Sequence, residues 1–159
     1  MPQTPTDRER STRERFTEEP NRFGAYRLAL GFPNSYEVGM SNLGFQWVYR
    51  LFNRIPDVVC ERFFHEEGAP AVTFETGTRL SEFGLLAWSL SWEMDIVHIL
   101  RTLQKAGIPV RREARDERHP ILLVGGDIAR MNPAALSPFV DVFALGDGER
   151  LVPRIAELL

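Results

Sequence analysis

The stretch YRLALGFPNS, residues 26–35, decides the fold. Its first seven residues, Tyr26 to Phe32, are mostly apolar and are closed by a proline, an asparagine and a serine. This pattern is typical of a buried β-strand that runs into a turn. Beyond the turn, apolar residues at positions 43–52 recur at helical spacing, and Ser41 is predicted to cap that helix. The segment therefore predicts a strand, a loop and a helix, in that order.

The same alternation continues toward the carboxyl end of the chain. LLAWSL at residues 85–90 and ILLVGG at residues 121–126 are apolar runs that predict buried strands, and DVFAL at residues 141–145 predicts a last strand. Helices are predicted from about Glu93 to Ala106 and again after the last strand, where an amphipathic pattern covers the final residues. Each of these strands is therefore expected to lead into or follow a helix.

The middle of the chain is less regular. Residues 58–64 predict one more strand, and the polar residues 65–68 end it. Strands that alternate with helices indicate a doubly wound, mainly parallel five-stranded sheet of the flavodoxin-like type. The strand from Tyr26 to Phe32 is expected to lie centrally in it.

Composition and charge argue against nucleic-acid binding, a thiolate metal site and a membrane span. The 159 residues carry a formal net charge of -3, which disfavours electrostatic capture of nucleic acid. The single cysteine, Cys60, can neither form an internal disulfide nor supply the several thiolates of a zinc or iron–sulfur site. No stretch approaches the run of about 20 apolar residues that a membrane span requires. A reducing, cytoplasmic setting is therefore expected.

Residues 1–22 differ from the rest of the chain. They mix proline, serine and threonine with closely alternating arginine and glutamate, and Phe16 is their main apolar residue. This composition predicts a disordered or loosely attached tail ahead of one domain at residues 23–159. A short helix from Thr12 to Glu19, docked through Phe16, is the alternative.

Ligands of open parallel sheets bind beyond the carboxyl ends of the strands. Three predicted loops, at residues 33–40, 91–93 and 127–132, should open at that edge. Their glycines allow close backbone approach and their serines offer hydroxyls, which together suit a slot for a large ligand with polar edges. The candidate residues are Gly39, Ser89, Ser91, Gly125 and Gly126. Taken singly, each serine could instead satisfy a neighbouring backbone group, and the glycine pair could simply end a strand.

The residues quoted so far resemble a known family. GFPNSYEVGMSNLG at residues 31–44 is similar to the opening signature of cobalamin-domain-containing radical S-adenosylmethionine (SAM) proteins. The resemblance extends through WSLSWE at 88–93, VGG at 124–126 and DVFALGDGE at 141–149, and so covers nearly all of residues 26–159. The middle region is shorter than in the family, which implies that the second crossover helix is reduced or absent. It implies a cobalamin-binding-type fold whose serine and glycine elements hold the nucleotide tail of the cofactor.

Two departures from the family pattern stand out. Its first element, Asp-x-His-x-x-Gly, reads Asn34-x-Tyr36-x-x-Gly39 here, so the histidine that ligates cobalt is replaced by a tyrosine. The CxxxCxxC motif, which holds a 4Fe-4S cluster in the following barrel domain of such enzymes, is absent from this chain. The resemblance therefore implies a non-catalytic N-terminal module whose partner is a radical SAM catalytic domain, in the same polypeptide or in another one.

Three functional hypotheses follow. The first is a module that binds cobalamin for a radical SAM enzyme, with Asn34, Tyr36, Gly39, Ser89, Ser91, Gly125 and Gly126 around the cofactor. The second, favoured by the replacement of the cobalt ligand, is a cofactor-free domain that docks on a radical SAM catalytic domain. A more distant third is a flavin or nucleotide binder, although the first loop lacks the run of hydroxyl residues that wraps a flavin phosphate. His65, His98 and His119 are scattered along the sequence and predict no metal site.

Overall fold

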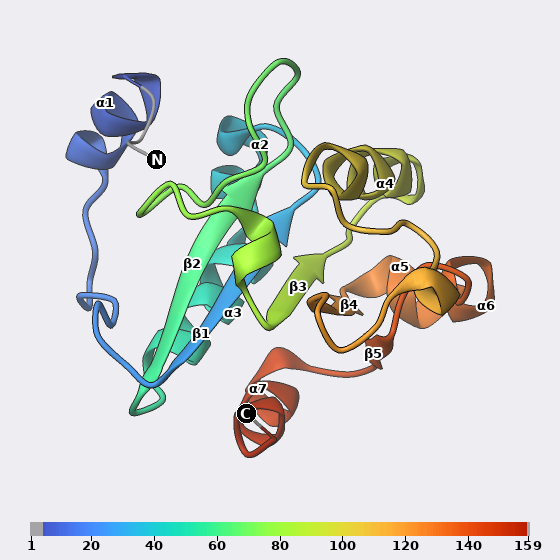
Figure 1. The fold of residues 1–159 in the computed structure, drawn as a ribbon. Helices are drawn as coiled ribbons and strands as arrows, with labels where there is room; N and C mark the ends of the chain where they lie inside the picture. Colours follow the sequence, from blue (N-terminus) through green and yellow to red (C-terminus); the bar gives the residue numbers. More distant parts are fainter. Residues whose placement is uncertain (1–4, 159) are drawn as a thin grey trace.

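The computed structural model describes residues 5–158. Its centre is a single sheet in which every strand pair is parallel (Figure 1). The strands, in spatial order, are β2 (Val58–Phe64), β1 (Tyr26–Phe32), β3 (Leu85–Ser89), β4 (Ile121–Gly125) and β5 (Val142–Ala144). The predicted five-stranded, flavodoxin-like sheet is thereby confirmed. β1 lies inside the sheet, between β2 and β3, but the middle strand is β3 rather than β1.

Helices cover both faces of the sheet. Side chains alternate along β1, so that Leu28 and Leu30 belong to one core and Ala29 to the other. The first core is closed by α3 (Leu43–Asn53) and α7 (Gly148–Ala156). The second is closed by α4 (Ile96–Lys105), α5 (Asp127–Met131) and α6 (Pro133–Leu136). The expected loop at residues 127–132 is therefore largely a helix, because α5 begins directly after the glycine pair.

Two short helices, rather than one, follow β1. α2 (Tyr36–Ser41) is capped by the Ser35 side chain, and α3 is capped by Asn42, whose side chain accepts a hydrogen bond of 2.9 Å from the Phe45 amide. The prediction that Ser41 caps the long helix is wrong by one residue. Its hydroxyl lies in the last turn of α2 and donates to the Val38 carbonyl at 2.7 Å.

The connection from β2 to β3 contains no α-helix, as predicted, and only one 3-10 turn, η1 (Leu80–Glu82). Polar contacts replace the missing helix. The carboxylate of Glu61 on β2 is buried and accepts hydrogen bonds of 2.6 Å from the hydroxyls of Thr73 and Thr76, and it also pairs with Arg27. Two further 3-10 turns are η2 (Glu93–Asp95) and η3 (Arg112–Ala114).

Residues 5–25 run from the separate helix α1 (Pro5–Arg13) along the outside of β2 and α3 (Figure 1). The predicted alternative of a helix from Thr12 to Glu19 is wrong, because the helix ends at Arg13. The looseness of the tail in solution stays a prediction, and its first four residues lie outside the described range. Within residues 5–158, no helix combines the length and the apolar character that crossing a membrane requires.

We predict that Gly31→Ala destabilises the fold. A methyl group at this position of β1 would lie 2.4 Å from the Phe63 ring and 2.7 Å from the Trp88 ring, so the core between two strands would have to shift. Such overpacking costs about 1–3 kcal/mol. Gly84→Ala is the matched control, because its added methyl would meet nothing within 4 Å. Urea unfolding followed by circular dichroism measures both, and equal midpoints would contradict the packing described here.

Candidate functional site

A cavity of about 380 Å³ lies at the carboxyl ends of β3 and β4, between the sheet and the helices α3 and α7. We call it the slot. Ser89, Ser91, Gly125 and Gly126 line it, together with Asn42 at the start of α3. Apolar side chains from both helices form its walls: Val48, Phe52, Leu151, Val152 and Ile155. The structure thus brings together four of the seven residues that the sequence suggested for a cofactor site.

A wider and more open depression, of about 540 Å³, adjoins the slot at the ends of β1 and β3. Trp92 and Met94 form part of its wall, and their side chains are exposed to 63% and 67%. Asn42 and Ser91 line both cavities, and the Asn42 amide donates to the Ser91 hydroxyl at 3.4 Å. The slot and the depression therefore meet at these two side chains and form one surface along the carboxyl edge.

Asn34 lies in the depression but is engaged with the protein itself. Its amide nitrogen donates to Asp95 at 3.3 Å, its side-chain oxygen accepts from the Ser35 amide at 2.9 Å, and its carbonyl accepts from the His65 amide at 3.0 Å. These contacts join the loop after β1 to the loops after β2 and β3. Asn34 therefore fixes the shape of the carboxyl edge.

The packing of this chain alone accounts for two of the predicted glycines. A methyl group on Gly126 would lie 2.4 Å from the Leu90 carbonyl oxygen, and the φ of Gly126 is 102°, which favours glycine. A methyl group on Gly39 would lie 2.6 Å from the Phe64 ring, so Gly39 faces β2 rather than the slot. Neither glycine is evidence by itself for a bound ligand.

Tyr36 also faces away from the slot. Its ring stacks on Phe74 with centroids 5.0 Å apart and meets the edge of Phe64, and its hydroxyl donates to the Glu14 carboxylate at 2.7 Å. Burial, together with the Glu14 carboxylate, raises the pKa of Tyr36 above its ordinary value. The structure therefore separates Tyr36 from the serines and glycines with which the sequence had grouped it.

Comparison with protein families matches residues 44–159 to the family of N-terminal domains described as "Radical SAM proteins, N-terminal". This chain belongs to that family. The match runs from α3 to α7, and so includes Ser89, Ser91, Gly125 and Gly126, but it begins after Asn34, Tyr36 and Gly39. Comparisons with curated proteins and with solved structures find no match.

A second polar site of this radical SAM N-terminal domain was not anticipated from the sequence. The Arg62 side chain on β2 is only 2% exposed, and its guanidinium donates to both oxygens of Glu14, at 2.8 and 2.7 Å, and to Glu75 at 2.7 Å. The rings of Tyr49 and Phe74 lie 4.7 and 5.0 Å from it. Although burial alone would lower the pKa of Arg62, the Glu75 and Glu14 carboxylates raise it, so the buried charge is kept.

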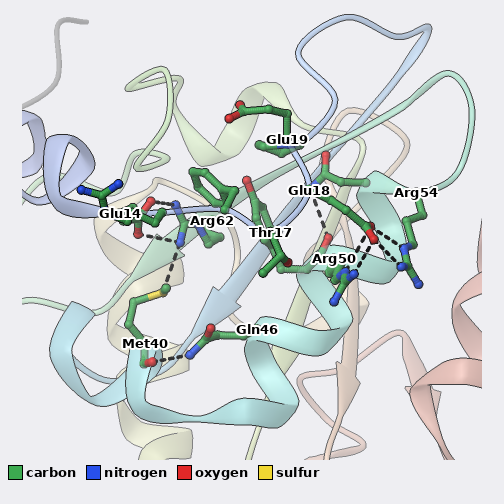
Figure 2. A pocket seen from close by; sticks show the side chains of 14 residues that line it. Glu14, Thr17, Glu18, Glu19, Met40, Gln46, Arg50, Arg54 and Arg62 are labelled. Carbon is green, nitrogen blue, oxygen red and sulfur yellow. Dashed lines mark hydrogen bonds and ion pairs between the residues drawn. The ribbon is translucent and has the colours of Figure 1, made fainter.

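A cavity of about 290 Å³ lies beside Arg62, between the N-terminal segment and α3 (Figure 2). Glu18 closes its other end by pairing with Arg50 and Arg54, the latter through hydrogen bonds of 2.7 and 2.6 Å. The one signal for this site in the sequence is the pair Glu61 and Arg62 within the apolar strand VVCERFF.

Two of the histidines, described above as scattered, lie face to face. The rings of His65 and His98 stack with centroids 4.5 Å apart. The Thr102 hydroxyl donates to the His98 carbonyl at 2.8 Å, so it accepts from Nδ1–H of His65 at 2.9 Å. Burial and the neighbouring His98 lower the pKa of His65 to about 4. Among residues 5–158, no group of three or more His, Cys, Asp or Glu side chains is placed to hold a metal ion.

We predict that this histidine pair makes stability depend on pH. A pKa of about 4, below the ordinary value of 6.5, means that folding favours neutral His65, so its contribution is complete above pH 6.5 and declines as the pH falls toward 4. The free energy of unfolding should drop over this range by at most about 3 kcal/mol, because each pKa unit corresponds to about 1.4 kcal/mol. His65→Leu should flatten that part of the profile, and the control His119→Gln should retain it. Identical profiles in urea unfolding for wild type and His65→Leu would contradict the assignment.

Proposed function

We propose that this domain is a cobalamin-binding-type module that serves a radical SAM catalytic domain. The observation that supports the proposal is the junction of the slot and the depression at Asn42 and Ser91. A narrow cavity joined to a broad one suits a cofactor that has a thin tail and a flat body. This junction lies at the carboxyl ends of parallel strands, where open α/β sheets bind their ligands.

The side chains around the two cavities fit the two parts of such a ligand. In the slot, the hydroxyls of Ser89 and Ser91 and the amide of Asn42 would hold a polar nucleotide tail, while apolar walls would contact its base. In the depression, Trp92 and Met94 would support the flat body. Bound cobalamin would supply methyl-group or electron transfer. The 4Fe-4S cluster and SAM would belong to the catalytic domain, since one cysteine cannot hold such a cluster.

The residues do not fit a cobalt-ligating role for the protein. The Tyr36 phenol is hydrogen-bonded to Glu14 and packed between aromatic rings, and its raised pKa keeps it neutral. In the depression, Asn34 and Asp95 are bonded to each other. We therefore propose that the lower face of cobalt receives no side-chain nitrogen.

The second candidate is a cofactor-free domain that docks on the catalytic domain. The exposure of Trp92 and Met94 favours it, because large exposed apolar side chains that lie together mark interaction sites. Both functions would use the same carboxyl edge. They differ in whether the slot takes up a ligand, which a binding experiment decides.

We predict that the purified chain binds hydroxocobalamin and that Ser89→Leu weakens this binding at least tenfold, because the larger side chain fills the slot. Ser81→Leu is the matched control, since Ser81 is exposed and lies in η1, before the start of β3. Equilibrium dialysis read by cobalamin absorption measures all three chains. Absence of binding in the wild type would favour the cofactor-free alternative, and equal binding by Ser89→Leu would remove the slot from the proposal.

We further predict that the cobalt(II) form of the complex shows no nitrogen splitting in its electron paramagnetic resonance spectrum. A coordinated nitrogen splits the cobalt lines, whereas a lower face open to water or shielded by protein does not. Tyr36→His supplies an imidazole at the family position, but the structure directs that side chain toward Glu14, so its spectrum should match that of the wild type. Nitrogen splitting in the wild-type spectrum would overturn this part of the proposal.

A further inference from the structure

The N-terminal segment lies in a groove where three arginines of the domain pair with its carboxylates. Residues 14–20, which we call the strap, cross α3 and the edge strand β2 without forming a helix or a strand. Two strap carboxylates contact three arginines of the domain (Figure 2): Glu14 pairs with Arg62, and Glu18 pairs with both Arg50 and Arg54. The groove therefore presents two cationic positions with a cavity of about 290 Å³ between them.

Arg62 is a buried, charged side chain whose orientation is fixed by its neighbours. Its guanidinium is 2% exposed and stays charged, it is flanked by the Tyr49 and Phe74 rings, and it directs Nη1 and Nη2 at the same carboxylate. This two-pronged geometry fits a carboxylate or a phosphate equally well. Glu75 bonds to Nε, on the other edge of the guanidinium, so it does not replace Glu14 at the fork.

The strap is held mainly by side chains. Glu18, Arg50 and Arg54 have side chains that are 33–47% exposed, and ion pairs at such exposure add little stability. α1, which precedes the strap, lies apart from the sheet (Figure 1) and contacts the domain through the Arg10 side chain, which pairs with Glu37 and Glu66. An anion in solution can therefore compete with the strap for the groove. It would replace Glu14 at Nη1 and Nη2 of Arg62, because Glu75 occupies only Nε.

We propose that Arg50, Arg54 and Arg62 form a binding site for a ligand with two anionic groups, carboxylates or phosphates, and that the strap is its intramolecular competitor. The site is separate from the slot, and so the proposal stands independently of cobalamin binding. Displacement of Glu14 also frees the Tyr36 hydroxyl, which bonds to the same carboxylate. Occupancy of the groove is thereby coupled to the loop after β1.

The test is a calorimetric titration of the full chain with pyrophosphate at constant ionic strength. A competitor lowers the apparent affinity by the fraction of molecules in which the groove is open. Glu14→Gln weakens the competitor at Arg62 and should lower the Kd by about tenfold. Glu18→Gln should lower it by about threefold, because its pairs are more exposed. Glu9→Gln is the matched control, since Glu9 is exposed on α1 and does not line the cavity, and it should leave the Kd unchanged.

A parallel titration with succinate distinguishes a dicarboxylate ligand from a phosphate ligand. Tight binding of either anion to Glu14→Gln supports the proposed site. Circular dichroism verifies folding, and Glu18→Gln, which alters only exposed ion pairs, provides the test if Glu14→Gln does not fold. Equal affinities in all four chains, or no binding of either anion to the folded glutamine variants, would overturn the proposal.

Discussion

Parallel hydrogen bonding between five strands, in a sheet that helices cover on both faces, determines how this chain must run. Because all strands run the same way, the chain must return after each strand, and all carboxyl ends open at one edge. β1 and β3 are neighbours, yet the chain leaves them toward opposite sides, to β2 and to β4. The depression lies at this switch point, between Asn34 after β1 and Ser91 after β3.

The edge strand β2 presents a different problem, because it carries a buried arginine. Arg62 keeps its charge only beside carboxylates, and these come from Glu75 in the β2–β3 connection and from Glu14 in the N-terminal segment. One guanidinium therefore fastens two irregular segments to the same strand. The Tyr36 hydroxyl also donates to the Glu14 carboxylate, and this contact holds Tyr36 beside β2 and away from the slot.

The sequence predicted what depends on local pattern and on topology. Apolar runs such as residues 121–126 locate the strands, and the rule for parallel sheets then groups Ser89 with Gly125. Sequence patterns did not predict contacts between distant polar residues, such as Glu14 with Arg62, 48 residues apart, or the stacking of His65 on His98. Hydrophobic periodicity indicates which face of a helix or strand is buried, but it does not indicate which partner a polar side chain contacts. The direction of Tyr36 was missed for the same reason.

We propose that the slot and the depression are one ligand surface at the carboxyl edge. Amide hydrogen exchange of the full chain, with and without saturating hydroxocobalamin, tests it most directly. We expect slower exchange in the segments 89–92 and 125–127, which contribute residues to the lining of the two cavities, and unchanged exchange in residues 14–20. Protection confined to residues 14–20, or no protection at residues 89–92 and 125–127, would contradict it.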